Sequence, residues 1–383
     1  MVVGAYYPEL SGAGLQCRAL VGRLRDEVDF TVLTTTADRS LPITETLDGV
    51  PVSRVFIDPA SWWSKAKGAV RFTAQFIRAR RRFSIVHLHG FSQKSTLLIG
   101  LALAGRKRIA IKLTSVGHDD PVSMRRRGRF AYWCYTRADL LFAVSPRFLE
   151  SYESAGLRSG RLRLIPNGVD LERFRPPMAG ERAALCRELS ITARGPVVLF
   201  VAFFSREKRP DLLFDAWARV ARSSSPDSVL VFVGATRSRY YEIDERLADD
   251  IRKHADALAL SSRIRFVEVT HEIERFYRAA DIFVLPSVRE GMPNALLEAM
   301  ASGAACIATR LPGITDSVIE DGRNGLLVPP DDVSALEHAL RRLVDDPAWA
   351  ARLGCAARRT IEARYGLDRA AAQYLDAYRS LNP

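Results

Sequence analysis

The sequence predicts an α/β protein with two doubly wound domains in tandem. Short apolar runs typical of strands alternate with longer helical patterns along the 383 residues. The alternation breaks at Pro166-Asn167-Gly168-Val169-Asp170 and then restarts, and a chain of this length exceeds one ordinary hydrophobic core. Such alternation indicates a mostly parallel sheet that helices cover on both faces. We expect an N-terminal domain over residues 1–166, a C-terminal domain over 167–355 and a terminal helical segment over 356–383.

The elements of the first half follow from the apolar periodicity. After an unusually short first strand at Val2-Val3, strands are expected at 30–33, 85–88, 109–113, 140–144 and 162–165, with helices at 16–25, 62–82 and 129–137. In the second half, strands are expected at 197–202, 229–233, 264–267, 282–285, 306–309 and 325–328. Helices are expected there at 211–222, 241–258, 272–279, 295–301 and 333–345.

Composition excludes several classes of protein. Apolar residues make up 48% and charged residues 26%, which is typical of a globular protein. No apolar run approaches the roughly 20 residues that cross a bilayer, and the N-terminal residues lack the layout of a signal peptide. The five cysteines are scattered without a CxxC pair, so neither a zinc site nor a disulfide framework is expected. We therefore expect a cytoplasmic protein.

The positive charge is concentrated in one region. The net charge is +12, and residues 51–150 hold 19 Lys/Arg against 5 Asp/Glu, a balance of +14. The remaining residues hold 37 against 39, a balance of −2. This asymmetry predicts an anionic partner surface. Nucleic acid is not expected, because no nucleic-acid-binding motif accompanies the charge.

The helix expected at 62–82 is amphipathic and basic. Placed on a helical wheel, its apolar face comprises Trp62, Ala66, Ala69, Val70, Thr73, Phe76 and Ile77. Its basic face comprises Lys67, Arg71, Arg78 and Arg82. We expect the apolar face to pack on a sheet. The basic face is then either solvated or in contact with the anionic inner face of the cell membrane.

The segment 285–303 carries the most chemical information. An apolar strand ends at Pro286-Ser287, a loop containing Gly291 follows, and a helix begins near Pro293 or Asn294. Free backbone N–H groups and the positive end of the helix dipole suit a diphosphate at such a junction. Glu290 lies in the loop and Glu298 about one turn inside the helix, where both can accept hydrogen bonds from sugar hydroxyls.

A second strand-to-helix loop supplies cations. Arg206 and Lys208 follow the strand at 197–202 and precede a helix. Cations at this edge of the sheet can neutralise a diphosphate leaving group. A basic run of this kind is also common in solvated loops.

These segments together resemble family 4 of the retaining glycosyltransferases. Glu290 and Glu298 match its E-x7-E motif, and Ile165-Pro166-Asn167-Gly168-Val169-Asp170 is similar to its interdomain crossover. The resemblance implies a GT-B fold, two Rossmann-like domains facing across a cleft, with the final helix crossing back to the first domain. It implies that Glu290 contacts the donor sugar and Glu298 the ribose hydroxyls. It also implies that Lys208 binds the diphosphate, and that the sugar and phosphate meet the loop residues Gly291, Met292, Pro293 and Asn294.

The resemblance also indicates residues of the N-terminal domain. The stretch from Tyr7 to Gly14 resembles the family's glycine loop near the donor phosphate, although an ordinary turn explains it equally. His118 follows an expected strand and matches a family histidine near the reacting face of the sugar; a histidine that caps a turn is the alternative. His89 lies near the end of its strand and is expected to border the acceptor site. Asp119-Asp120 is not a D-x-D motif, so no catalytic metal or other cofactor is expected.

One departure from the family pattern affects the phosphate site. The family has Gly-Arg where this chain has Ala202-Phe203, and Arg206 is the candidate substitute for the missing arginine. The expected activity is retaining transfer of a sugar from a UDP- or GDP-sugar to a sugar or lipid-linked acceptor hydroxyl, in the synthesis of a cell-surface polysaccharide or glycolipid. The alternatives are a sugar-nucleotide epimerase, a phosphorylase or a non-catalytic binding protein of the same fold.

Overall fold

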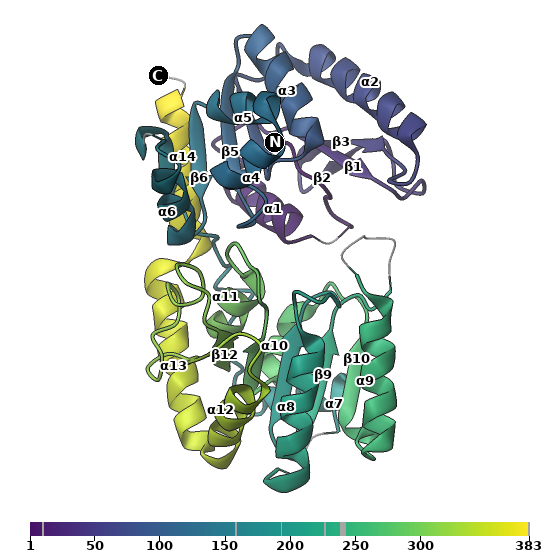
Figure 1. Ribbon diagram of the computed structural model, residues 1–383, viewed down its shortest axis with the longest axis vertical. Helices are drawn as coiled ribbons and strands as arrows, with labels where there is room; N and C mark the ends of the chain where they lie inside the picture. The colour runs from purple at the N-terminus through teal and green to yellow at the C-terminus, as the bar shows by residue number, and fades with distance from the viewer. Residues whose placement is uncertain (10, 158, 193, 226, 238–242, 382–383) are drawn as a thin grey trace. The chain divides into compact units, whose positions relative to one another are not determined.

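The chain forms two compact units in the computed structural model, which describes residues 1–9, 11–157, 159–192, 194–225, 227–237 and 243–381 (Figure 1). Unit 1 comprises Met1–Gly168 and Leu367–Pro383, and unit 2 comprises Val169–Gly366. Unit 1 is thus assembled from two separate stretches of sequence. The division after Gly168 lies two residues beyond the boundary expected from sequence. The return to unit 1 begins at Leu367, not at residue 356.

Unit 1 contains seven labelled strands and seven labelled helices within its described residues. The strands are β1 (Val32–Thr36), β2 (Thr44–Leu47), β3 (Val50–Phe56), β4 (Ile85–His89), β5 (Arg108–Leu113), β6 (Leu140–Ala143) and β7 (Leu162–Leu164). The helices are α1 (Gly12–Leu24), α2 (Trp62–Ala79), α3 (Gln93–Ala104), α4 (Pro121–Arg126), α5 (Arg129–Thr136), α6 (Pro146–Ser154) and α14 (Leu367–Leu381), with a 3-10 turn at Ser159–Arg161.

Val2 joins the two sheets of unit 1. The strand orders are β1-β3-β2 and β4-β5-β6-β7. Val2 forms parallel bridges to Leu33 of β1 and Leu88 of β4, and its N–H donates to the carbonyl of His87 at 2.8 Å. Val2 therefore lies between β1 and β4. The sheet β1-β3-β2 extends from one side of it, and the sheet β4-β5-β6-β7 extends from the other.

Helix α14 completes the core of unit 1. Its apolar side chains, among them Tyr374 and Ala377, pack with Leu20 of α1 and Phe142 of β6. Figure 1 shows this yellow helix beside the blue strand β6, far from it in sequence. Burial of this face explains why the last stretch of chain belongs to unit 1 and not to the unit that precedes it.

The antiparallel hairpin β2–β3 is absent from the sequence-based expectation. Asp48 and Gly49 have φ of 51° and 82°, and Leu47 pairs with Val50 across them. An Asp-Gly pair with positive φ at both residues is a strong local signal for a two-residue hairpin loop. This Asp-Gly signal was present in the sequence. Strand β2 was nevertheless not predicted, because it is exposed or half-buried and lacks the apolar run on which the strand predictions relied.

The predicted inward face of α2 is wrong. Gly68, Phe72 and Phe76 are its buried residues, whereas Trp62, Ala66, Ala69, Val70 and Ile77 are exposed. A Cβ at Gly68 would lie 2.8 Å from Cγ1 of Ile57. Glycine therefore allows the helix to approach β3, and the two phenylalanines fill the adjacent space. Of the predicted apolar face, only Phe76 is buried.

Unit 2 contains six labelled strands and seven labelled helices within its described residues. The strands are β8 (Val197–Val201), β9 (Val229–Val233), β10 (Ile264–Val267), β11 (Ile282–Leu285), β12 (Ala305–Thr309) and β13 (Leu326–Val328). The helices are α7 (Glu181–Glu188), α8 (Pro210–Ser223), α9 (Glu245–Ala257), α10 (Ile273–Ala279), α11 (Asn294–Ala301), α12 (Val333–Asp345) and α13 (Pro347–Arg364), with a 3-10 turn at Ser261–Arg263. Across the described parts of both units, no helix combines the length and apolarity needed to cross a bilayer.

The sheet of unit 2 is parallel and doubly wound. Its order is β10-β9-β8-β11-β12-β13. Strand side chains alternate between the two faces, so Ile282 and Val284 of β11 pack in the cluster formed with α8, α9 and α12, while Phe283 contacts Tyr277 of α10. The order reverses between β8 and β11, and open sheets of this kind bind ligands outside the carboxyl ends of the strands at this point.

Candidate active site

The loops after β8 and β11 meet at the point where the strand order of unit 2 reverses. The two strands are paired in parallel, so both chains leave the sheet at the same edge. The N–H of Val288 donates to the carbonyl of Glu207 at 2.8 Å, and the guanidinium of Arg289 donates to the Glu207 carboxylate at 2.6 Å. These contacts join the loop that carries Lys208 to the loop that carries Glu290.

Lys208 and Glu290 form an ion pair at this edge. Nζ of Lys208 donates to Oε1 of Glu290 at 2.6 Å, and the two side chains are 17% and 10% exposed. The structure thus brings together two residues that lie 82 positions apart in the sequence. An ammonium and a carboxylate in this position offer charge to a phosphate and hydrogen-bond acceptors to hydroxyls.

Arg206 does not take part in this ion pair. The Arg206 side chain is 81% exposed and its Nε donates to Oδ2 of Asp244 at 2.9 Å, near the start of α9. Phe203, at the position where the resemblance predicts an arginine, has its ring centroid 5.9 Å from Nζ of Lys208. Phe203 therefore places an aromatic face near the Lys208 ammonium.

Helix α11 positions Glu298. The helix begins at Asn294 after Pro293, and Gly291, Met292 and Pro293 of the preceding loop are buried. Oη of Tyr277, on α10, donates to Oε2 of Glu298 at 3.0 Å. Burial raises the pKa of Glu298 from 4.5 to about 7, although the Tyr277 hydrogen bond and the charge of Arg173 act in the opposite direction. The carboxyl can therefore exchange protons near neutral pH.

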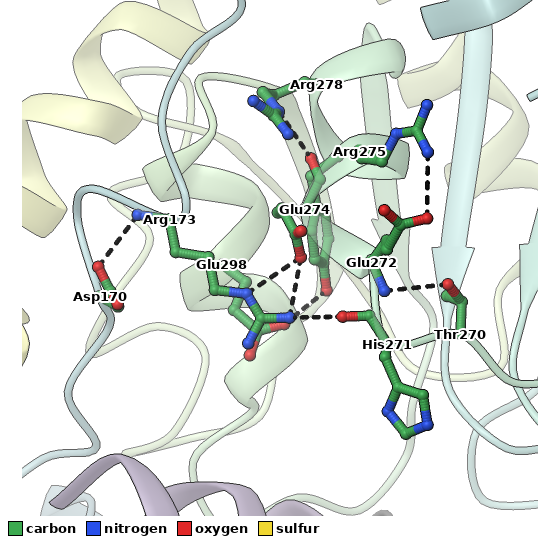
Figure 2. Close-up of polar contacts among 10 residues, drawn as sticks. Asp170, Arg173, Thr270, His271, Glu272, Glu274, Arg275, Arg278 and Glu298 are labelled. Carbon is green, nitrogen blue, oxygen red and sulfur yellow. Dashed lines mark hydrogen bonds and ion pairs between the residues drawn. The ribbon is translucent and has the colours of Figure 1, made fainter. Parts of the chain in front are cut away.

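Arg173 is fixed next to Glu298 by several contacts (Figure 2). Its guanidinium donates to Oε2 of Glu274 at 2.8 Å and to the carbonyl of His271 at 3.0 Å, and its backbone N–H donates to Asp170. Arg173 thus connects the segment around Asp170 to the first turn of α10. Glu298 could be predicted from the sequence, but its neighbours could not, because nothing in their sequence spacing relates them to it: Arg173, Glu274 and Tyr277.

Gly14 of unit 1 lies in the first turn of α1 and not in a preceding loop. A Cβ there would lie 2.3 Å from the carbonyl oxygen of Ala5, and the Gly14 N–H already donates to the capping Oγ of Ser11 at 3.0 Å. The close approach of the chain to itself accounts for this glycine, and donor contact through it stays a prediction.

His118 is half-buried in the turn between β5 and α4. The neighbouring Asp119 is buried, and its carboxylate accepts hydrogen bonds from the N–H groups of Phe91, Thr114 and Ser115. Asp119 thereby connects the loops that follow β4 and β5, and it holds the turn that carries His118. His118 could be identified as a candidate from the sequence, whereas the supporting role of Asp119 is visible only in the structure.

His89 lies in the interior of unit 1. Its side chain is 6% exposed and its ring centroid is 4.6 Å from that of His87, which lies two residues earlier on the same face of β4. Burial holds the pKa of His89 well below 6.5, so its imidazole is neutral. The proposed contact with an acceptor stays a prediction, and this burial does not favour it.

Comparison with known proteins identifies the family. The sequence model of the family described as Glycosyltransferase Family 4 matches residues 10–173. The sequence model of the family described as Glycosyl transferases group 1 matches residues 195–346. The lipopolysaccharide core biosynthesis mannosyltransferase LpcC of Rhizobium leguminosarum bv. viciae is 30% identical over 310 residues, which are 79% of this chain and 80% of that protein. The chain belongs to glycosyltransferase family 4.

Two further likenesses concern this glycosyltransferase. A D-inositol 3-phosphate glycosyltransferase of Kineococcus radiotolerans is 29% identical over 373 residues, 90% of this chain and 84% of that one. The structure of Anabaena HepE in complex with UDP and glucose matches with a TM-score of 0.80 and 18% identity over 99% of both chains. At that identity the likeness shows the fold alone. The predictions of family and of a GT-B fold are confirmed.

Proposed function

We propose that this glycosyltransferase takes its sugar from a nucleotide-diphosphate donor bound at the loops after β8 and β11. The observation that carries the proposal is the Lys208–Glu290 pair at the reversal point of the sheet, next to the start of α11. Lys208 and the helix N-terminus would hold the diphosphate. Glu290 would accept hydrogen bonds from the sugar, and Glu298 from the ribose.

We infer a reaction that retains the anomeric configuration. The bond from the anomeric carbon to the phosphate oxygen breaks, with its electron pair leaving on the phosphate. The acceptor oxygen forms the new bond on the same face, and its proton passes to the departing phosphate. Lys208 and the α11 amides would stabilise the charge that develops. In this mechanism, protein groups supply the positive charge that stabilises the departing phosphate. We therefore propose that no metal or cofactor takes part.

The acceptor and the location form a second part of the proposal. We propose a sugar or lipid-linked acceptor in cell-surface polysaccharide or glycolipid synthesis, reached from the cytoplasm at the inner face of the membrane. LpcC is named for lipopolysaccharide core biosynthesis. The excess positive charge of residues 51–150 and the free thiols of all five cysteines support this location.

Calorimetric titration with UDP-glucose, GDP-mannose and ADP-glucose tests the donor site. We expect one of these to bind the wild-type chain, and Lys208→Ala and Glu298→Ala to weaken that binding at least about tenfold. Lys253→Ala on α9 is the matched control, because Lys253 is exposed and lies outside the site. Unchanged affinity in both site variants would overturn the assignment of residues.

The product distinguishes the reaction classes. NMR of the product formed from the bound donor is expected to show the donor's anomeric configuration. Inversion would refute retention. Turnover that requires inorganic phosphate instead of an acceptor hydroxyl would identify a phosphorylase, and interconversion of the donor itself would identify an epimerase.

A further inference from the structure

The outward face of α2 carries large apolar side chains in contact with solvent. Trp62, Trp63, Val70 and Ile77 are 63%, 62%, 70% and 44% exposed. The two indoles stack with ring centroids 3.8 Å apart. Positions 63, 66, 70 and 77 follow three-, four- and seven-residue spacings, so Trp63, Ala66, Val70 and Ile77 share one helix face.

The opposite face of α2 fixes this orientation. Phe72 and Phe76 are buried, and the ring of Phe76 packs edge-on against Phe83 at 5.2 Å. Gly68 lies against Ile57, where a Cβ would not fit without movement. Turning the apolar face inward would expose both phenylalanines and press larger residues against β3. The outward position of the tryptophans is therefore a consequence of the packing.

A row of unpaired cations borders the apolar face. Lys67, Arg71 and Arg78 are exposed and lie four and seven positions apart, so they form one stripe. None of the three has a carboxylate within ion-pair distance among the residues that the structure describes. The sequence explains this, since residues 59–118 contain neither Asp nor Glu. Elsewhere many surface arginines have an acidic partner, as Arg163 does in Asp376.

Exposed apolar side chains concentrate in this part of unit 1. Of the thirteen exposed large apolar residues described, eight lie on α2 to α5: Trp62, Trp63, Val70, Ile77, Leu103, Val122, Phe130 and Trp133. On α5 the rings of Phe130 and Trp133 are parallel within 13° at 6.0 Å. Helix α3 contacts both α2 and α5. Such concentrations mark interaction sites in soluble proteins.

We propose that the outward face of α2 docks on the anionic surface of a lipid bilayer. The indoles of Trp62 and Trp63 would enter the headgroup region with Val70 and Ile77, and Lys67, Arg71 and Arg78 would lie against lipid phosphates. An anionic bilayer offers phosphates to the cations that have no carboxylate partner, and hydrocarbon to the apolar face beside them. This inference rests on the membrane location proposed above and specifies which helix makes the contact. It does not depend on the donor site, which we propose in unit 2.

Co-sedimentation with vesicles tests the proposal. The wild-type chain should sediment with phosphatidylcholine–phosphatidylglycerol vesicles but not with phosphatidylcholine alone, and added salt should release it. The triple variant Lys67→Glu, Arg71→Glu and Arg78→Glu should bind the anionic vesicles about a hundredfold more weakly, since each cation contributes roughly fivefold. The matched control reverses three exposed arginines of unit 2, Arg222, Arg352 and Arg359, and should bind as the wild type does.

Tryptophan fluorescence separates insertion from adsorption. Brominated lipids should quench the emission of the wild-type chain, and Trp62→Phe with Trp63→Phe should lose most of this quenching while still sedimenting. Trp62→Ala with Trp63→Ala should lose both. These positions are exposed, so circular dichroism melts of the variants should match that of the wild type.

Three results would overturn the proposal. Equal sedimentation with neutral and anionic vesicles would remove the role of the cations. Equal binding by the wild type and by the α2 variants would place any membrane contact elsewhere. A wild-type dimer that Trp62→Ala with Trp63→Ala dissociates would identify the face as a self-association surface. Donor affinity, measured on the same variants and expected to be unchanged, keeps this test separate from that of the donor site.

Discussion

Lys208 and Glu290 form an ion pair, with 2.6 Å between Nζ and Oε1. Their loops follow adjacent parallel strands, so the fold itself brings the two charges together. A diphosphate sugar would exchange these partners, because its phosphates would attract Lys208 and its hydroxyls would donate to Glu290. Both side chains are mostly buried and held by their mutual contact, which limits the side-chain entropy that they would lose on binding a ligand.

Removal of Lys208 is expected to impair catalysis more than folding. Lys208→Ala should lower kcat/KM about 10²- to 10³-fold, since it deletes the charge that would stabilise the leaving phosphate. Glu290→Gln should relieve the unpaired carboxylate that Lys208→Ala leaves behind, so the double variant should be more stable than Lys208→Ala alone. Steady-state kinetics and urea unfolding measure these effects. Additive losses of stability would contradict the coupling.

The stability of unit 2 should depend on the titration of Glu298. Its folded-state pKa of about 7 lies above the ordinary 4.5, so folding favours the protonated carboxyl. This contribution is complete below about pH 4.5 and is lost as the pH rises through about 7. Glu298→Gln should therefore gain unfolding free energy relative to the wild type between about pH 5 and 8. Urea unfolding across that range tests this, with the exposed Glu245→Gln as a control that should show no such trend.

Loss of the Tyr277 hydroxyl should shift the pH dependence of donor binding. The ionised Glu298 is the better acceptor for ribose hydroxyls, so affinity should rise as the pH increases through about 7. The Tyr277 hydrogen bond lowers the pKa of Glu298, and Tyr277→Phe should therefore move the midpoint of binding to higher pH. Titrations at several pH values measure it. Tyr365→Phe, which removes a hydroxyl bound to the Ser317 carbonyl, should leave the midpoint unchanged.

Two glycines of α1 should respond in opposite ways to alanine. Gly14→Ala would place a Cβ 2.3 Å from the Ala5 carbonyl oxygen, and we expect a loss of about 1–3 kcal/mol in unfolding free energy. Gly22 has no atom within 4 Å of such a Cβ, so Gly22→Ala should gain up to about 1 kcal/mol through helix propensity. Thermal melts of both variants check this. A stable Gly14→Ala protein would show that the first turn of α1 can move.

The sequence alone determined the strands of the parallel sheet of unit 2 and the loops that follow them. Strands at 229–233 and 282–285 match the structure because both faces of these strands are buried and the apolar run is continuous. Lys208, Glu290 and Glu298 could be chosen because they follow expected strands at strand-to-helix junctions and because their segments resemble the family's motifs. The hairpin β2–β3 and the face that α2 buries were not predicted, because the apolar periodicity alone did not indicate them.

Only the tertiary structure decided which side chains meet. The Lys208–Glu290 pair, the Tyr277–Glu298 hydrogen bond and the place of Arg173 join residues that are distant along the chain, and their distances depend on how α10 and α11 pack on β11. The face that α2 buries was set by Gly68 and Ile57 fitting together, against the apparent amphipathic pattern. Shape complementarity in a close-packed interior is a property of pairs of elements, which a single stretch of sequence does not contain.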